Sequence, residues 1–157
     1  MEESDWSSDV CSSDLFPVVR DLIVDRGALD DLIRAGGHVA VDAGTAPDAD
    51  ALPVGEERAE LALDFAACIG CGACVAACPN GAAHLFAGSK LMHLSLLPLP
   101  SLERQRRVVA VVDELEELFG PCSNYGECAR ACPAGIPLTA IAAVNHERLL
   151  AGLQRRL

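Results

Sequence analysis

The stretch CIGCGACVAACP, residues 68–79, decides the fold: it carries four cysteines in the spacing Cys-x2-Cys-x2-Cys-x3-Cys-Pro. This spacing is typical of the ligands of iron–sulfur clusters. The first three thiols lie close enough in the sequence to bind one cluster, whereas the fourth, followed by Pro79, belongs to a different cluster. The stretch therefore predicts that a second group of ligands lies elsewhere in the chain.

A second group, CSNYGECARACP at residues 122–133, repeats the first with a tyrosine in place of the second cysteine. It reads Cys-x2-Tyr-x2-Cys-x3-Cys-Pro, so Tyr125 takes a ligand position. In proteins with two such groups, the last cysteine of each group binds the cluster of the other. This rule assigns one cluster to Cys68, Cys71, Cys74 and Cys132, and the other to Cys78, Cys122 and Cys128.

The number of thiols predicts the kind of cluster at each site. Four thiolates hold a [4Fe-4S] cluster, and three thiolates beside Tyr125 favour a [3Fe-4S] cluster, because an iron without a thiolate is readily lost. A second [4Fe-4S] cluster with oxygen or water on its fourth iron is the alternative. Zinc is a further alternative, since it binds thiolates well. A three-cysteine group that ends in Cys-Pro favours clusters over zinc.

The composition limits the class of protein. The net charge is −11, and the acidic excess lies within residues 1–60, where fifteen Asp and Glu face four Arg. No basic surplus can neutralise phosphates, so we predict no nucleic-acid partner. No signal peptide is recognised, which favours reduced metal-binding thiols over disulfides. Residues 65–89 carry no charge, but glycines, cysteines and Pro79 interrupt them, and no transmembrane helix is predicted.

We divide the chain into three segments. Residues 1–15, MEESDWSSDVCSSDL, repeat Ser-Ser-Asp, and we interpret them as a foreign or disordered segment in which Cys11 has no assigned role. Residues 16–60 are predicted to be a linker with one short helix, ALDDLIRAGG, that ends at Gly36 and Gly37. Residues 61–157 are predicted to form the domain that holds the clusters.

The domain that holds the clusters is predicted to be helical. Residues 82–97 suit a helix that ends before Pro98, and Ser101 is the predicted N-cap of the next helix. The buried positions of that next helix are predicted to be Val108, Val111, Val112, Leu115, Leu118 and Phe119. Pro137 suits the first turn of a last helix, with a buried face of Leu138, Ile141, Ala142 and Leu149. The fold class is therefore mainly α: an α-helical ferredoxin-type domain with two iron–sulfur clusters held between helices.

At these residues the chain resembles the iron–sulfur subunit of succinate dehydrogenase and fumarate reductase. The matching features are CIGCGACVAACPNG, the helix before the second group, and CSNYGECARACPAGIPL. The resemblance covers residues 16–157. It implies an electron-transfer subunit that takes electrons from a flavoprotein subunit and passes them through [4Fe-4S] and [3Fe-4S] clusters to a quinone at membrane anchor subunits. It also implies a peripheral position on the cytoplasmic face of the bacterial inner membrane.

The chain departs from this family in one respect. Family members carry a [2Fe-2S] cluster in an N-terminal domain, but its cysteine spacing, Cys-x4-Cys-x2-Cys, is absent here. We therefore expect the chain to be the C-terminal part of a longer subunit, with residues 16–60 as the remnant of the region after the missing domain. On its own, such a fragment is expected to be inactive, because the relay from the flavin to the quinone would lack its [2Fe-2S] cluster.

The quinone end of the relay has fewer signals. Pro79 matches a proline that lies near the quinone in the family. The tryptophans that some members carry just beyond it are absent from residues 80–83, which leaves menaquinone open. His84, Lys90 and His93 either serve a quinone or its protons, or occupy solvent-facing positions of a helix. His38 and His146 are interpreted as surface histidines.

Two other classes of function remain as alternatives. One is a free-standing ferredoxin-like carrier, or an iron–sulfur subunit of another dehydrogenase, such as a glycolate oxidase or a heterodisulfide reductase. Those proteins generally keep four cysteines in both groups, so Tyr125 counts against them. The other is a structural module without a redox role.

Overall fold

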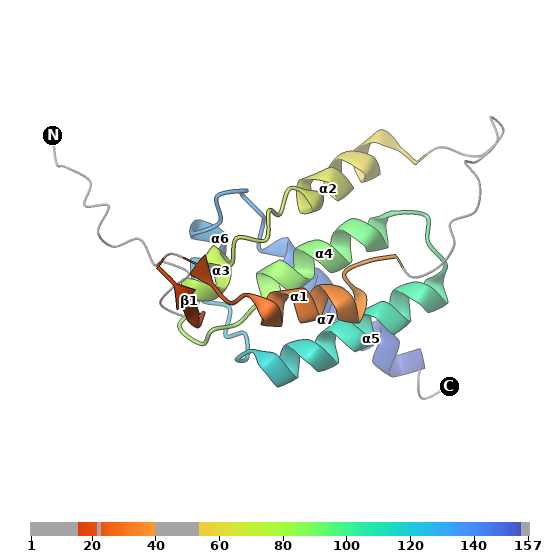
Figure 1. Ribbon diagram of the computed structural model, residues 1–157. Coiled ribbons are helices and arrows are strands. Elements are labelled where there is room, and N and C mark those ends of the chain that lie inside the picture. The colour runs from red at the N-terminus through yellow and green to blue at the C-terminus, as the bar shows by residue number, and fades with distance from the viewer. Residues whose placement is uncertain (1–15, 22, 40–53, 155–157) are drawn as a thin grey trace, which may run out of the picture.

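The computed structural model describes residues 16–21, 23–39 and 54–154 (Figure 1). In chain order, the elements are β1 (Val18–Arg20), β2 (Ile23–Val24), α1 (Gly27–Gly36), α2 (Glu56–Ala66), α3 (Ala73–Ala76), α4 (His84–Leu96), α5 (Ser101–Leu118), α6 (Glu127–Arg130) and α7 (Thr139–Gln154). The strands β1 and β2 form a small antiparallel pair. The predicted fold class, mainly α, is confirmed.

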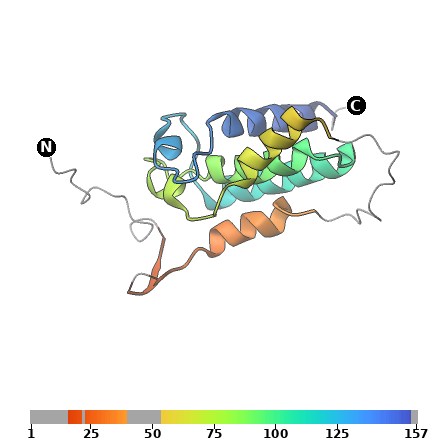
Figure 2. The same cartoon turned by 90° about the horizontal axis from the view of Figure 1, so that it is seen from above.

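The long helices form a bundle around α4. Helix α4 packs against α2, α5 and α7, and α5 packs against α1 and α7. In Figure 2, α1 lies on one side of α4 and α5, whereas α2 and α7 lie on the other. The short helices α3 and α6, which lie within the two groups of cysteines, pack together at one end of this bundle (Figure 1). The bundle thus presents both cysteine groups at the same end.

Two glycines let the long helices approach closely. A Cβ at Gly36 of α1 would lie 2.5 Å from Cγ of Arg107 in α5. A Cβ at Gly88 of α4 would lie 2.6 Å from the carbonyl oxygen of Ala140 in α7. Distances this short would force the helices apart, so both contacts require glycine.

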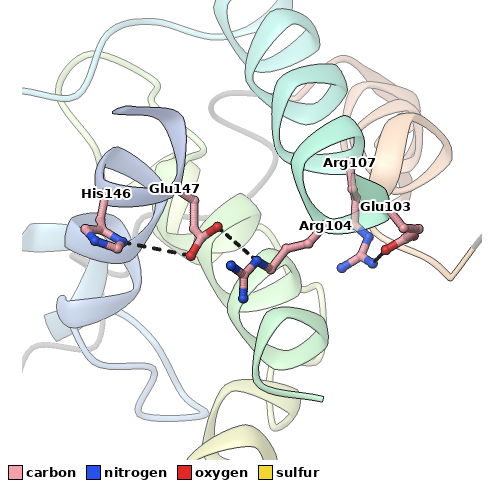
Figure 3. Close-up of polar contacts among 5 residues, drawn as sticks. All are labelled: Glu103, Arg104, Arg107, His146 and Glu147. Carbon is pink, nitrogen blue, oxygen red and sulfur yellow. Dashed lines mark hydrogen bonds and ion pairs between the residues drawn. The ribbon is translucent and has the colours of Figure 1, made fainter. Parts of the chain in front are cut away.

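Charged side chains connect α5 and α7 away from the cysteines (Figure 3). Nε of Arg104 lies 3.3 Å from Oε2 of Glu147, and the other carboxylate oxygen of Glu147, Oε1, lies 3.8 Å from Nδ1 of His146. The buried Arg107 pairs with Glu103 one turn earlier on α5. Because the side chains of Arg104 and Glu147 are 31% and 12% exposed, water screens their ion pair only in part, and the pair helps to fix α7 against α5.

Two predictions about the helices are wrong in part. Ser101 is the first residue of α5 and not its N-cap, a position that Pro100 takes without a side-chain cap. On the last helix, Ile141 is buried as predicted, but Leu138 and Leu149 are 45% and 68% exposed and Ala142 is also exposed. The buried face centres on Ala140, Ile141 and Val144. At 100° per residue, Leu149 lies about 135° away from that centre.

The predicted buried face of α5 is nearly correct. Its buried residues include Val108, Val111, Val112 and Leu115, as expected. Leu118 is 39% exposed, and Phe119 is a half-buried residue just after the helix. The buried face therefore ends at Leu115, about one turn before the end of the helix at Leu118.

Phe16 and helix α1, which precede the predicted domain, pack on the helical bundle. Leu29 and Leu32 of α1 are each 2% exposed and belong to the same core as α5, and Phe16 is 6% exposed. As predicted, α1 ends at Gly36 with Gly37 as its C-cap. Helix α2 begins at Glu56, before the domain boundary placed at residue 61. The segment 1–15, with Cys11, lies outside the described residues. No helix in the described part of the chain is long and apolar enough to span a membrane.

Candidate metal centre

The first cavity lies between the two cysteine groups. Its lining includes Cys68, Cys71, Cys74 and Cys132, the four residues that the crossed rule assigns to one cluster. Leu85, Phe86 and Ile136 close its apolar side, and its empty volume is about 330 Å³. We call these four thiols and their cavity the four-cysteine site.

The second cavity lies beside the first and has almost the same empty volume, about 320 Å³. Cys78, Cys122 and Cys128 line it, together with Tyr125 and His84. We call these three thiols and their cavity the three-cysteine site. The two sites differ in the number of thiols that line them, four in one and three in the other.

The two cysteine groups follow the same backbone path. The residues 54 positions apart in the two groups have matching positive φ angles: Gly70 and Asn124 (67° and 56°), Gly72 and Gly126 (both 83°), and Gly81 and Gly135 (62° and 66°). Between the second and the third of these positions, each group forms a four-residue helix, α3 or α6. The repeat predicted from the sequence is therefore also a repeat of the backbone, in which Tyr125 stands where Cys71 stands.

The described cysteines suit a metal cluster. All seven are free thiols. Burial, and then the neighbouring thiols of Cys68, Cys132 and Cys71, raise the pKa of Cys74 to about 12. A raised pKa favours the protonated thiol. A metal centre reverses this preference, because thiols lose their protons when they bind metal.

The three-cysteine site shows a weaker form of the same effect. Burial raises the pKa of Cys128, backbone hydrogen bonds partly oppose this, and the thiols of Cys122 and Cys78 add to the rise. The neighbours of each perturbed thiol include other members of its predicted set, and Cys128 of the three-cysteine site also contributes, last in size, to the raised pKa of Cys74. Within the described ranges, no three His, Cys, Asp or Glu side chains are spaced to hold a single metal ion. The thiols surround cavities of several hundred cubic ångströms instead.

Side chains from distant parts of the sequence support the two loops. Nζ of Lys90 donates to the carbonyl oxygen of Cys68 at 3.0 Å, and the guanidinium of Arg26 donates to the carbonyl of Gly70. In the other loop, the side-chain amide of Asn80 donates to the carbonyl oxygen of Pro121 at 3.0 Å and to Oγ of Ser123 at 2.8 Å. The roles of Arg26 and Asn80 were not predictable from local sequence patterns, because their contacts join residues more than 40 positions apart.

The residues considered for the quinone end occupy different places. Pro79 is exposed and lines the cavity of the three-cysteine site, as does the half-buried His84. Nδ1 of His84 is buried, with no hydrogen-bond partner among the described residues. Lys90 and His93 are also half-buried. Both interpretations of these three residues of α4, a role at a quinone and solvent-facing positions, therefore stay predictions.

Two of the four histidines are exposed, and the other two are half-buried and have lowered pKa values. His38 and His146 are exposed, as expected. Burial and the charge of Arg148 lower the pKa of His84, which Glu116 partly offsets. Burial and the charge of Lys90 lower the pKa of His93. Both shifts favour the neutral imidazole.

Comparison with known proteins agrees with this arrangement. Residues 67–136 match the family of 4Fe-4S dicluster domains. The chain is 34% identical over 139 residues to the succinate dehydrogenase iron-sulfur subunit of Bacillus subtilis (strain 168). This match covers 84% of the present chain and 54% of the relative, so the chain spans about half the length of that protein. As the cysteine motifs predicted, the chain carries an iron–sulfur ferredoxin-type domain and is related to the iron–sulfur subunit of succinate dehydrogenase.

Proposed function

We propose that this chain transfers single electrons between a [4Fe-4S] cluster in the four-cysteine site and a [3Fe-4S] cluster in the three-cysteine site. The main observation is the pair of adjacent cavities, each lined by one of the two thiol sets that the crossed rule assigns. Iron–sulfur clusters supply one-electron chemistry when bound, and the protein contributes their ligands and surroundings. The chain would thus act as a component of an oxidoreductase complex.

The residues of the four-cysteine site suit this role. Cys68, Cys71, Cys74 and Cys132 would bind the cluster as thiolates, and the protons that they lose would leave the site on assembly. Leu85 and Phe86, each 2% exposed, keep water from the apolar side of the cavity. A cluster surrounded by apolar side chains changes its charge in a low dielectric, so burial and hydrogen bonds set its potential.

The three-cysteine site differs at one corner. Cys78, Cys122 and Cys128 would hold three irons, whereas Tyr125 lines the cavity at the fourth ligand position. Its side chain is 58% exposed, so water reaches this corner. A neutral phenol is a weaker ligand for iron than a thiolate. These features support [3Fe-4S] over a second [4Fe-4S] cluster.

We extend the proposal to the partners of the relative's complex. A flavoprotein subunit would supply or receive electrons by way of a [2Fe-2S] cluster whose ligand spacing this chain does not contain. The three-cysteine site, with Pro79 at its edge, would face a quinone, such as menaquinone, at the membrane anchor subunits. The chain would then lie peripherally on the cytoplasmic face of the membrane. Whether the whole complex oxidises succinate or reduces fumarate depends on its other subunits and on the potentials of the clusters.

Reconstitution with iron and sulfide under anaerobic conditions tests this function. We expect iron and sulfide contents that correspond to two clusters, an EPR signal of the oxidised protein from [3Fe-4S], and a second signal from [4Fe-4S] on reduction. Zinc uptake with no EPR signal at any potential would contradict the proposal. Two four-iron signals would contradict only the assignment of the three-iron cluster.

A further inference from the structure

Lys90 is the single lysine of the chain, and its side chain is fixed against the four-cysteine site. It lies on α4, where its Nζ donates to the carbonyl oxygen of Cys68 at 3.0 Å in a partly buried position. The same Nζ lies 5.9 Å from the centre of the Phe86 ring, a distance at which a cation is attracted to the face of an aromatic ring. Two contacts therefore hold the ammonium group.

Phe86 connects this ammonium to the cavity. Its ring lines the cavity of the four-cysteine site, and a Cβ at Gly70 would lie 3.8 Å from its Cε2 atom. Lys90 itself does not line the cavity. The ammonium thus lies behind the wall formed by Phe86 and the Cys68 backbone, where it cannot bind a cluster but can act on it electrostatically.

A second cation supports the same loop. The guanidinium of Arg26, at the start of α1, donates to the carbonyl of Gly70. The carbonyls of Cys68 and Gly70 therefore both accept hydrogen bonds from cationic side chains. Because Arg26 is exposed and Lys90 is half-buried, solvent screens the charge of Lys90 less than that of Arg26.

In the corresponding loop of the three-cysteine site, the described cross-loop hydrogen bonds come from a neutral side chain. The neutral amide of Asn80 makes the hydrogen bonds to Pro121 and Ser123. Arg148, which lines a cavity with Cys122 and Asn124, is paired with Glu116 at 2.5 Å. In the repeat, the position of Lys90 is occupied by Val144, which is 2% exposed. Nearby, Arg130 is paired with Glu127 at 2.7 Å. The repeat thus differs in charge as well as in the number of thiols.

We propose that Lys90 is a positioning residue of the four-cysteine site, whose ammonium charge stabilises the reduced state of the bound cluster and so raises its midpoint potential. Thiolate ligands bring negative charge, and reduction adds one further negative charge. A fixed positive charge nearby stabilises the more negative state, and a partly buried one does so with little screening. This role rests on the proposed function, because it requires a cluster in that site.

The test is an EPR-monitored redox titration of the full chain after anaerobic reconstitution with ferrous iron and sulfide. Lys90→Met removes both the charge and the hydrogen bond, Lys90→Gln keeps a donor without charge, and Lys90→Arg keeps both. We expect lower midpoint potentials of the [4Fe-4S] signal in the Met and Gln variants and a value near that of the wild type in the Arg variant. The [3Fe-4S] potential should change much less. Arg58→Gln is the matched control, because this arginine donates to the carbonyl of Leu96 at the other end of α4.

The outcomes separate this role from the general function. Potentials in Lys90→Gln and Lys90→Met that equal the wild-type value would overturn the role of Lys90 while the clusters remain. Should Lys90→Met fail to hold its cluster, the Gln and Arg variants decide, since equal potentials in those two would overturn the role of charge. A wild-type chain that takes up no iron would overturn the proposed function, and this role with it.

Discussion

The four-cysteine and three-cysteine sites are two copies of one backbone design with different side chains. Their loops share three positive φ angles and a four-residue helix. They differ in three ways. Tyr125 takes the position of a thiol, and Val144 takes the position of Lys90. The neutral amide of Asn80 donates hydrogen bonds to one loop, whereas the cationic side chains of Lys90 and Arg26 donate to the other. Under the proposed function, the shared backbone would allow both sites to hold a cluster. The side chains would then give the two clusters different compositions and electrostatic surroundings.

The largest expected effect comes from a ligand that crosses between the groups. Cys132 lies in the second group but lines the first cavity, so Cys132→Ser should abolish most of the [4Fe-4S] signal and leave [3Fe-4S] nearly intact. EPR and iron content measure both. Cys11→Ser is the matched control and should change neither signal. Selective loss of [3Fe-4S] in Cys132→Ser would disprove the crossed assignment.

A second substitution would remove the main difference between the sites. Tyr125→Cys places a thiol where Cys71 stands in the other loop, and the backbone there already follows the same path. We expect conversion of [3Fe-4S] toward [4Fe-4S], with one more iron per chain and a lower midpoint potential. EPR of the oxidised protein measures the loss of the three-iron signal. Tyr125→Phe should retain that signal, and an unchanged signal in Tyr125→Cys would count against an open fourth corner.

The equivalent glycines of the two loops give a smaller effect on stability. Gly72 and Gly126 both have φ of 83°, which costs a residue with a side chain about 1–2 kcal/mol. A Cβ at Gly72 would also lie 2.7 Å from Cε2 of Phe16, whereas the nearest atom to a Cβ at Gly126 is 3.7 Å away. Gly72→Ala should therefore lower the free energy of unfolding more than Gly126→Ala. Urea unfolding of both variants measures this, and equal losses would show that Phe16 moves aside freely.

The smallest expected effect is a change of one pKa. Burial and then the charge of Lys90 lower the pKa of His93. Lys90→Gln removes only the second cause, so the pKa of His93 should rise and still stay below its ordinary value. An NMR titration of the imidazole measures it. Arg58→Gln should leave it unchanged, and an equal rise in that variant would show that the field of Lys90 is not specific.

The lowered pKa of His93 also predicts how the free energy of unfolding depends on pH. A histidine with a lowered pKa in the folded state binds fewer protons there than in the unfolded chain, so its contribution to stability is lost as pH falls below about 6.5. His93→Gln should make the free energy of unfolding less sensitive to pH across this range. Urea unfolding above and below it measures the difference. An unaltered pH dependence would contradict the lowered pKa.

The grouping of the cysteines was predictable from the sequence because cluster chemistry imposes a short, fixed spacing on cysteines. The crossed rule follows from that spacing, and each set that it assigns lines one cavity, whereas the binding of clusters by these sets stays a prediction. Helix α5 was also predictable, because its buried valines recur with the period of a helix. Such local patterns carry their information within one or two turns.

The supports of the site were not predictable in the same way. Arg26 contacts the four-cysteine loop only because α1 packs on the bundle, and Asn80 reaches the second loop across 41 residues. The predicted buried face of α7 was wrong at Leu149. The spacing of an apolar residue does not identify the buried face of a helix when the opposite face is equally apolar. Tertiary packing decided these cases.

The close contact between Gly88 of α4 and Ala140 of α7 has a consequence for electron transfer. Helix α4 follows the first cysteine group and α7 follows the second, so the contact joins the two halves of the repeat nearly backbone to backbone. The rate of electron tunnelling falls steeply with distance, and it also falls when the surroundings must rearrange. A rigid joint between the two halves would keep the tunnelling distance constant and the reorganisation energy low.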